Sequence, residues 1–123
     1  MDKSRSAAQW RRIVEEVPAL GRITVDPEVL ETIARLTALA VPGVARIAPV
    51  PRSRLLGGKE GVRITLQDGS VLVDLYLVVE SGYNMLALGR QVQAEVTRAI
   101  QEMVGLDVEA VNVYIEDVVP ASR

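Results

Sequence analysis

The side chains that could carry out acid–base chemistry in this chain are carboxylates and lysines, because the sequence contains no His and no Cys. It therefore lacks the commonest general base, the thiolate nucleophile and the usual zinc ligands. Four carboxylates fall in or beside segments that alternate like strands: Asp74, Glu80, Glu116 and Asp117. Two carboxylates could hold Mg2+ or exchange protons only if the fold brought them together. Strand alternation points Asp74 and Glu116 toward solvent, so we expect no catalytic residue, no metal site and no cofactor.

A second stretch with possible chemistry is Gly57-Gly-Lys-Glu-Gly61, which combines glycines with a lysine. An NTPase phosphate loop needs a longer spacing, a Ser or Thr after the Lys, and a following helix. The G-x-x-G clamp of a KH domain grips nucleotides between two helices, whereas here a strand is expected to follow. This stretch is therefore expected to be a flexible loop.

Basic residues surround this loop, and phosphates are bound mainly by cations. The candidate anion patch consists of Arg46, Arg52, Arg54 and Lys59. It could contact RNA, a nucleotide or an acidic lipid, but no aromatic residue lies between the cations to stack on a base. Nucleic acid is therefore not the expected partner, and a solvated loop remains the other interpretation.

The hydrophobic pattern predicts the elements that position these side chains. We expect strands at 21–25, 44–48, 62–67, 71–80 and 108–115, and helices that follow Asp26 and Asn84. The predicted buried stripes are Val29, Leu30, Ile33, Ala34, Leu36 and Ala40 in the first helix, and Leu88, Val92, Val96, Ala99, Ile100 and Met103 in the second. This order predicts an α+β fold, a two-layer α/β sandwich in which two amphipathic helices cover one face of a mixed sheet of about five strands.

A short N-terminal helix is predicted from about Ser6 to Val17, where apolar residues recur at helical spacing around Trp10. This helix could dock on a membrane or a partner, or it could pack on its own domain or on a second copy. The expected organisation is an N-terminal tail with this helix at 1–19, a single domain at 20–119 and a short tail at 120–123.

The outward face of the predicted sheet combines apolar, aromatic and polar residues. Together with Trp10, the candidate protein interface consists of Leu72, Asp74, Tyr76, Val78, Asn112 and Tyr114. Tyrosine pairs a rigid apolar ring with a hydroxyl group, which suits interfaces. Two interpretations stay open: this face binds a partner, with self-association the expected form, or the Trp10 segment folds back and covers it.

The ordered set Gly21-Arg-Ile-Thr-Val25, Val41-Pro-Gly-Val44 and Val71 to Val79 resembles the bacterial alkaline shock (envelope stress response) protein family. Gly82, Asn84, Val92-Gln93, Gly105-Leu106 and Val111-Asn-Val113 continue that family's order over about residues 20–119. The family offers no catalytic motif. The resemblance implies a small cytoplasmic protein linked to cell-envelope stress, of a kind that a separate anchoring protein can hold near the membrane.

These observations predict a non-enzymatic interaction or scaffold protein that self-associates or binds a protein partner. No apolar run is long enough to span a membrane. We therefore expect the protein in the cytoplasm, either free or held at the inner membrane surface by a membrane-anchored partner. The alternative function is an anion-binding module for RNA, nucleotide or acidic lipid that uses the basic 46–59 segment.

Overall fold

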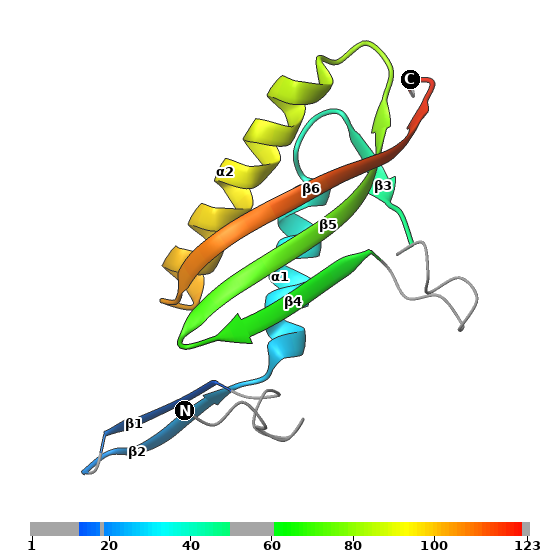
Figure 1. Cartoon of the computed structure of the whole chain (residues 1–123). Coiled ribbons are helices and arrows are strands. Elements are labelled where there is room, and N and C mark those ends of the chain that lie inside the picture. Colours follow the sequence, from blue (N-terminus) through cyan, green and yellow to red (C-terminus); the bar gives the residue numbers. More distant parts are fainter. Residues whose placement is uncertain (1–12, 18, 50–60, 122–123) are drawn as a thin grey trace.

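The structure is a computed structural model that describes residues 13–17, 19–49 and 61–121. Its elements are β1 (Ile13–Val17), β2 (Gly21–Val25), α1 (Pro27–Leu39), β3 (Val44–Ile47), β4 (Val62–Gln67), β5 (Ser70–Glu80), α2 (Met85–Met103) and β6 (Asp107–Val119). Both helices lie against one face of the sheet formed by β3 to β6 (Figure 1). The predicted α+β fold, a two-layer sandwich on a mixed sheet, is confirmed.

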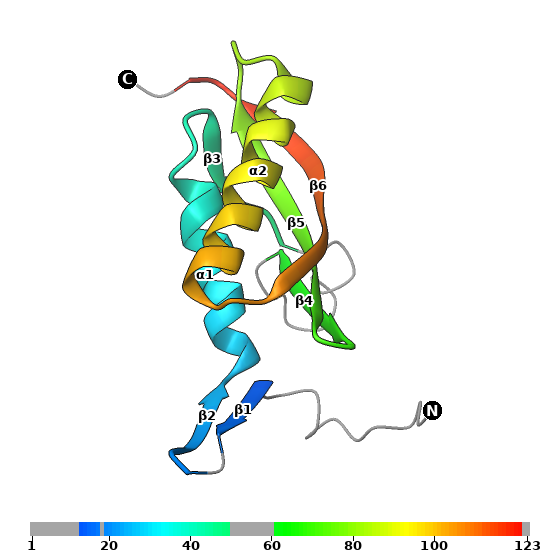
Figure 2. The same cartoon turned by 90° about the vertical axis from the view of Figure 1, so that its left-hand side faces the viewer.

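The sheet is built around the long strand β5. One side of β5 pairs antiparallel with β3 near its end and with β4 near its start, and the other side pairs parallel with β6 along its length. The main sheet therefore has four strands. The fifth predicted strand, β2, pairs instead with β1 in a separate hairpin beyond the start of α1 (Figure 2).

Gly61 allows β3 and β4 to meet along the same side of β5. The backbone N–H of Tyr76 donates to the Gly61 carbonyl at 2.8 Å, and the Ala48 N–H donates to the Tyr76 carbonyl at 2.7 Å. A Cβ on Gly61 would lie 2.1 Å from the Ala48 carbonyl oxygen, closer than any side chain could be. Glycine is therefore required at this junction, where both backbone polar groups of Tyr76 are hydrogen-bonded.

Local signals set the ends of the main elements. The Asp26 carboxylate accepts a hydrogen bond from the N–H of Glu28 at 3.0 Å, and the Asn84 side chain accepts one from Ala87 at 2.9 Å. Both are helix N-caps that satisfy a donor left free in the first turn. Asp68 and Gly69 both have positive φ, at 49° and 80°, as a tight two-residue hairpin turn requires.

The core lies between the sheet and the helices. Alternate residues of β5 supply its floor, and every second residue from Val71 to Val79 is 0% exposed. The helices cover this floor with a stripe of buried side chains: Leu30, Ile33, Ala34, Ala38, Leu88, Val92, Val96 and Ile100. The predicted stripes are correct at their centres but too wide, because Leu36 is 59% exposed and Met103 is 70% exposed. Val29 and Ala40 are also exposed.

The predicted N-terminal helix is wrong where the structure describes it, because Ile13–Val17 forms β1. Its residues pair antiparallel with β2, from Ile13 opposite Val25 to Val17 opposite Gly21. Ile and Val are β-branched and favour strands, and a neighbouring strand supplies hydrogen bonds that a short isolated helix would have to make alone. The rest of the predicted helix, with Trp10, lies outside the described residues.

The final strand is longer than the sequence predicted, since β6 continues beyond Ile115 to Val119. Its pairing with β5 shifts register twice, by one residue at Glu109 and by one at Glu116, and resumes after each. Bulges of this kind interrupt an edge strand locally and increase its twist. The acidic residues near the end of β6 therefore belong to the sheet.

Candidate interaction surface

The face of the sheet opposite the helices carries the predicted interface residues. Figure 1 looks onto this face, which neither α1 nor α2 covers. β5 and β6 run parallel in a register that pairs Asp74 with Asn112 and Tyr76 with Tyr114. The structure therefore brings these four candidates together in two adjacent rows across the strands. Leu72 lies in the next row toward the start of β5, opposite Ala110.

Tyr76 and Tyr114 stack on each other. Their ring centroids are 4.6 Å apart and the ring planes differ by 14°. Tyr114 remains 42% exposed, while Tyr76 is half-buried between its neighbours. Stacked aromatic pairs and directly opposed strand residues both stabilise the arrangement that holds them. The two rings therefore form an ordered, partly exposed aromatic surface.

The row beside the tyrosines is polar and internally hydrogen-bonded. The side-chain amide of Asn112 donates to Oδ1 of Asp74 at 2.9 Å, and both groups are part-buried. On the other side of Asp74, the register places the exposed Arg63 of β4 directly opposite. The Asp74 carboxylate is thus hydrogen-bonded across to β6 and has a cationic residue opposite it on β4.

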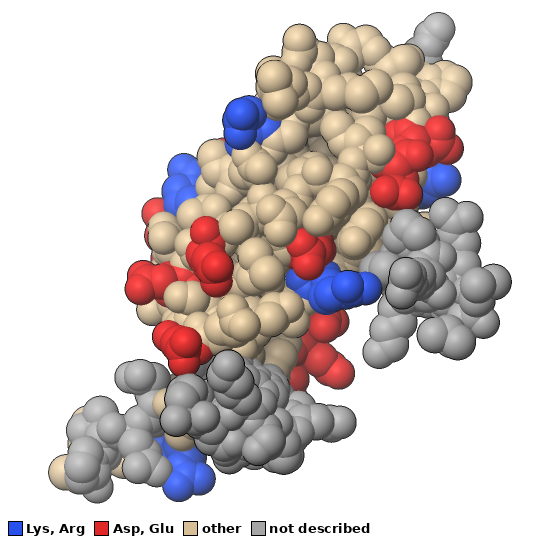
Figure 3. Space-filling view, viewed as in Figure 1, with Lys and Arg blue, Asp and Glu red and all other residues tan. Residues whose placement is uncertain are grey.

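Most of the remaining surface on this side is uncharged, as Figure 3 shows. Val78 differs from the other candidates because it is only 2% exposed, although it lies on the outward side of β5. Its predicted part in an exposed interface is therefore wrong. The described part of the N-terminal segment does not cover the face, since β1 pairs with β2 away from the main sheet (Figure 1).

The other carboxylates weighed in the sequence lie near the ends of their strands, Glu80 in β5 and Glu116 and Asp117 in β6. Glu116 and Asp117 are exposed on β6. Within residues 13–17, 19–49 and 61–121, no group of three or more His, Cys, Asp or Glu could hold a metal ion. In the same residues, no helix has the length and hydropathy needed to cross a membrane.

The predicted anion patch is represented by one residue, Arg46, which is exposed on β3. Arg52, Arg54 and Lys59 lie outside the described residues, as does most of the glycine-containing stretch. The patch therefore stays a prediction.

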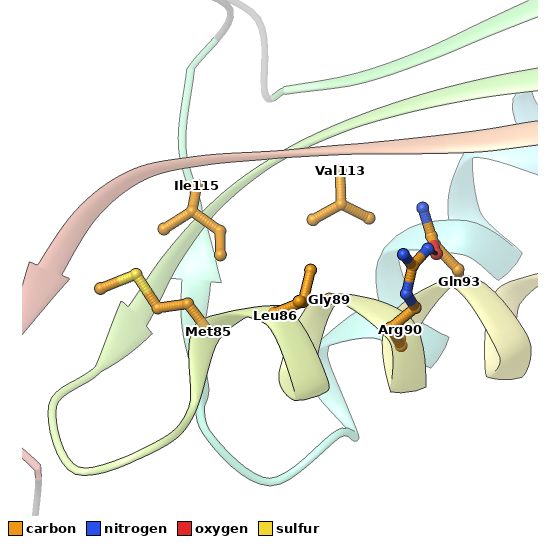
Figure 4. Close-up of a pocket in the computed structure, with 7 residues that line it drawn as sticks. All are labelled: Met85, Leu86, Gly89, Arg90, Gln93, Val113 and Ile115. Carbon is orange, nitrogen blue, oxygen red and sulfur yellow. Dashed lines mark hydrogen bonds between the residues drawn. The ribbon is translucent and has the colours of Figure 1, made fainter.

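One site that the sequence reasoning missed is a groove between α2 and β6 (Figure 4), with a volume of about 280 Å³. Its walls are the first turns of α2 and the inward side chains Val113 and Ile115 of β6. A sequence signal was present, because Gly89 interrupts an otherwise good helix. The pattern alone did not indicate which strand faces that glycine.

Comparison with known proteins gives a family match over most of the chain. The model of the alkaline shock protein 23 family, described as having a cell envelope-related function, matches residues 15–120. The uncharacterized protein YqhY of Bacillus subtilis is 29% identical over 102 residues, which cover 78% of this chain and 76% of that protein. The uncharacterized protein Spy1535 of Streptococcus pyogenes is 30% identical over 106 residues, with 81% of each chain covered.

Solved structures show a more distant likeness. The MamM CTD matches with a TM-score of 0.49 and 16% sequence identity, over 73% of this chain and 96% of that one.

Proposed function

This chain belongs to the alkaline shock protein family with a cell envelope-related function, and from that premise we propose that it is a non-catalytic interaction protein. Its working part is the open sheet face formed by Leu72, Asp74, Tyr76, Asn112 and Tyr114. The partner on this face is a second copy of the chain. We further propose that it acts in the cytoplasm at the inner membrane surface, where a membrane-anchored protein would hold the assembled chain; the family's cell envelope-related function supports the link to the envelope.

The observation that carries this proposal is the stacked pair of Tyr76 and Tyr114. Tyrosine is enriched among the residues that contribute most to binding. Side chains already ordered before binding lose less conformational freedom when a partner docks. Here the stack and the neighbouring Asp74–Asn112 hydrogen bond fix the side chains in the isolated chain. The face is thus prepared for contact at a small entropic cost.

Self-association is favoured over another protein by the composition of this surface. A two-fold contact uses the same patch on both copies, so the patch must complement itself. Across its rows the face offers exposed basic Arg63, acidic Asp74 and two aromatic rings, and both charge signs are therefore present on one patch. Two such faces in opposite directions can bring unlike charges together around a shared aromatic centre.

The test is sedimentation velocity of the full chain over a concentration series, with Tyr114→Ala as the variant. We expect the parent chain to associate as its concentration rises. We expect Tyr114→Ala to weaken this association by about tenfold or more, because truncating a central interface Tyr commonly costs over ~1.4 kcal/mol of binding free energy. Tyr83→Ala is the matched control, because Tyr83 is 45% exposed but lies between β5 and α2. A parent chain that remains monomeric throughout, or equal effects of the two variants, would contradict the proposal.

A further inference from the structure

The groove between α2 and β6 has features of a binding site that is separate from the sheet face. It opens on the helix-covered side of the sheet, and Figure 4 shows Val113 and Ile115 pointing toward the α2 residues below them. Met85 and Leu86 add apolar surface and are 45% and 71% exposed. Its volume of about 280 Å³ falls below the ~300–1,000 Å³ typical of small-molecule pockets. A groove of this volume has room for one large apolar side chain.

Gly89 keeps this groove open at a cost to the helix. It lies within α2, where glycine is less favourable than alanine by about 1 kcal/mol. A Cβ on Gly89 would meet nothing within 4 Å, so no contact in the structure requires glycine there. With glycine at this position, no side chain from this turn of α2 fills the groove.

The groove lies beside a free strand edge. β6 is an outer strand of the sheet, and among the described residues no further strand pairs with it. The side-chain amide of Gln93 donates to the backbone carbonyl of Val111 at 3.0 Å, which shows that the polar groups of Val111 point away from β5. Alternate residues of a strand direct their backbone groups to the same side, so those of Val113 and Ile115 are available to an incoming extended segment.

Charge on this edge determines which segment can bind. β6 carries four acidic residues and no basic one: Asp107, Glu109, Glu116 and Asp117. Pairing two β6 edges would bring like charges together, which is unfavourable. An extended segment with basic residues is favoured instead. Arg90 lies at the groove wall, where its guanidinium donates a hydrogen bond to the Gln93 side chain. A guanidinium in this position can also pack on the face of an aromatic ring.

We propose that the groove receives Trp10 from a second copy of this chain. Trp10 is the single Trp of the sequence and is followed directly by Arg11 and Arg12. Its indole supplies the large apolar group that the groove fits, and the two arginines supply positive charge for Glu116 and Asp117 at the end of β6. The backbone of the same segment extends the sheet by pairing with Val113 and Ile115.

Chain length requires the second copy. Trp10 precedes Ile13 by three residues, a reach of about 10 Å. Ile13 pairs with Val25, next to the N-terminus of α1. The groove begins at the first turn of α2. That turn lies at the opposite end of α1, where a Cβ added to Gly43 would come within 2.9 Å of the Tyr83 ring. Because the 13 residues of α1 span about 20 Å, Trp10 cannot reach the groove of its own chain. Figure 2 shows the hairpin and the start of α2 at opposite ends.

The test uses the fluorescence of Trp10 in the full chain, since no other Trp contributes. In a concentrated solution we expect an emission maximum typical of a buried indole, and on dilution we expect it to shift to the red as Trp10 enters water. Gly89→Leu fills the groove and should raise the apparent dissociation constant for this shift at least tenfold. Ala94→Leu is the matched control, because Ala94 is exposed on the same helix outside the groove.

Two results would overturn this proposal: an emission maximum that does not depend on concentration, or a dilution shift that Gly89→Leu leaves unchanged. Circular dichroism on both variants confirms that the helix is retained. The outcome is independent of the sheet-face proposal, because Tyr114→Ala should leave the dilution shift of Trp10 in place. A chain that fails the tyrosine test and keeps a Gly89-dependent shift would associate through the groove alone.

Discussion

The contacts of single residues on the open sheet face depend on which residues lie opposite them on the neighbouring strands. Asp74 is read from the sequence as a solvated carboxylate, and in the structure it accepts a hydrogen bond from Asn112, 38 positions later in the chain. The sequence predicts that both side chains point outward, because each strand alternates. It does not predict their contact, because the parallel register at this pair depends on the length of the intervening segment with α2 and on the bulge at Glu109.

The Asp74–Asn112 hydrogen bond should make a measurable contribution to stability. In a double-mutant cycle of Asp74→Ala and Asn112→Ala, we expect a coupling free energy of about 0.5–1.5 kcal/mol, the usual net value for such a bond. Urea unfolding of the four proteins measures it. The pair of Thr65→Ala with Asn112→Ala is the control, since Thr65 lies on β4 in the row of Leu72 and makes no bond to Asn112 in the structure. Additive effects of Asp74→Ala and Asn112→Ala would show that the bond is not formed.

The elements differ in how far local sequence determines them. α2 has a clear N-cap, a regular apolar stripe and a stop at Gly105, so its position follows from residues within the segment. β1 does not, because the spacing of Ile13, Val14 and Val17 also fits one face of a helix. Pairing with β2 makes this segment a strand, and that pairing depends on the turn between β1 and β2. The groove could not be predicted from the sequence, because its walls come from both α2 and β6 and the sequence does not show which part of β6 faces α2.

Two glycines, Gly61 just before β4 and Gly89 within α2, should respond to substitution by alanine in opposite ways. Gly61→Ala should destabilise the chain by roughly 1–3 kcal/mol, because its Cβ would overlap the Ala48 carbonyl. Gly89→Ala should instead stabilise it by about 0.5–1 kcal/mol, since the added methyl meets no atom and favours the helix. Thermal and urea unfolding of both variants measure the sign. A destabilising Gly89→Ala would mean that the helix needs glycine for its own packing, which removes one support for the groove proposal.

The whole molecule presents two distinct surfaces on one small sandwich. The open sheet face is built by residues of β4, β5 and β6, whereas the groove lies on the helix side of β6. The layered fold and most of the core follow from hydrophobic periodicity. The width of the sheet does not, because the predicted five strands divide into a main sheet of four and part of a separate hairpin. Family membership adds a cell envelope-related context to these surfaces.

The most direct test of the central claim is to map which residues change environment when the full chain associates. Backbone amide NMR spectra over a concentration series would measure this for each residue. The proposed function predicts that the largest changes fall on Arg63, Leu72, Asp74, Tyr76 and Tyr114, and that they disappear in Tyr114→Ala. Amide signals on the sheet face that stay constant while the chain associates would contradict the claim, and so would changes confined to the two helices.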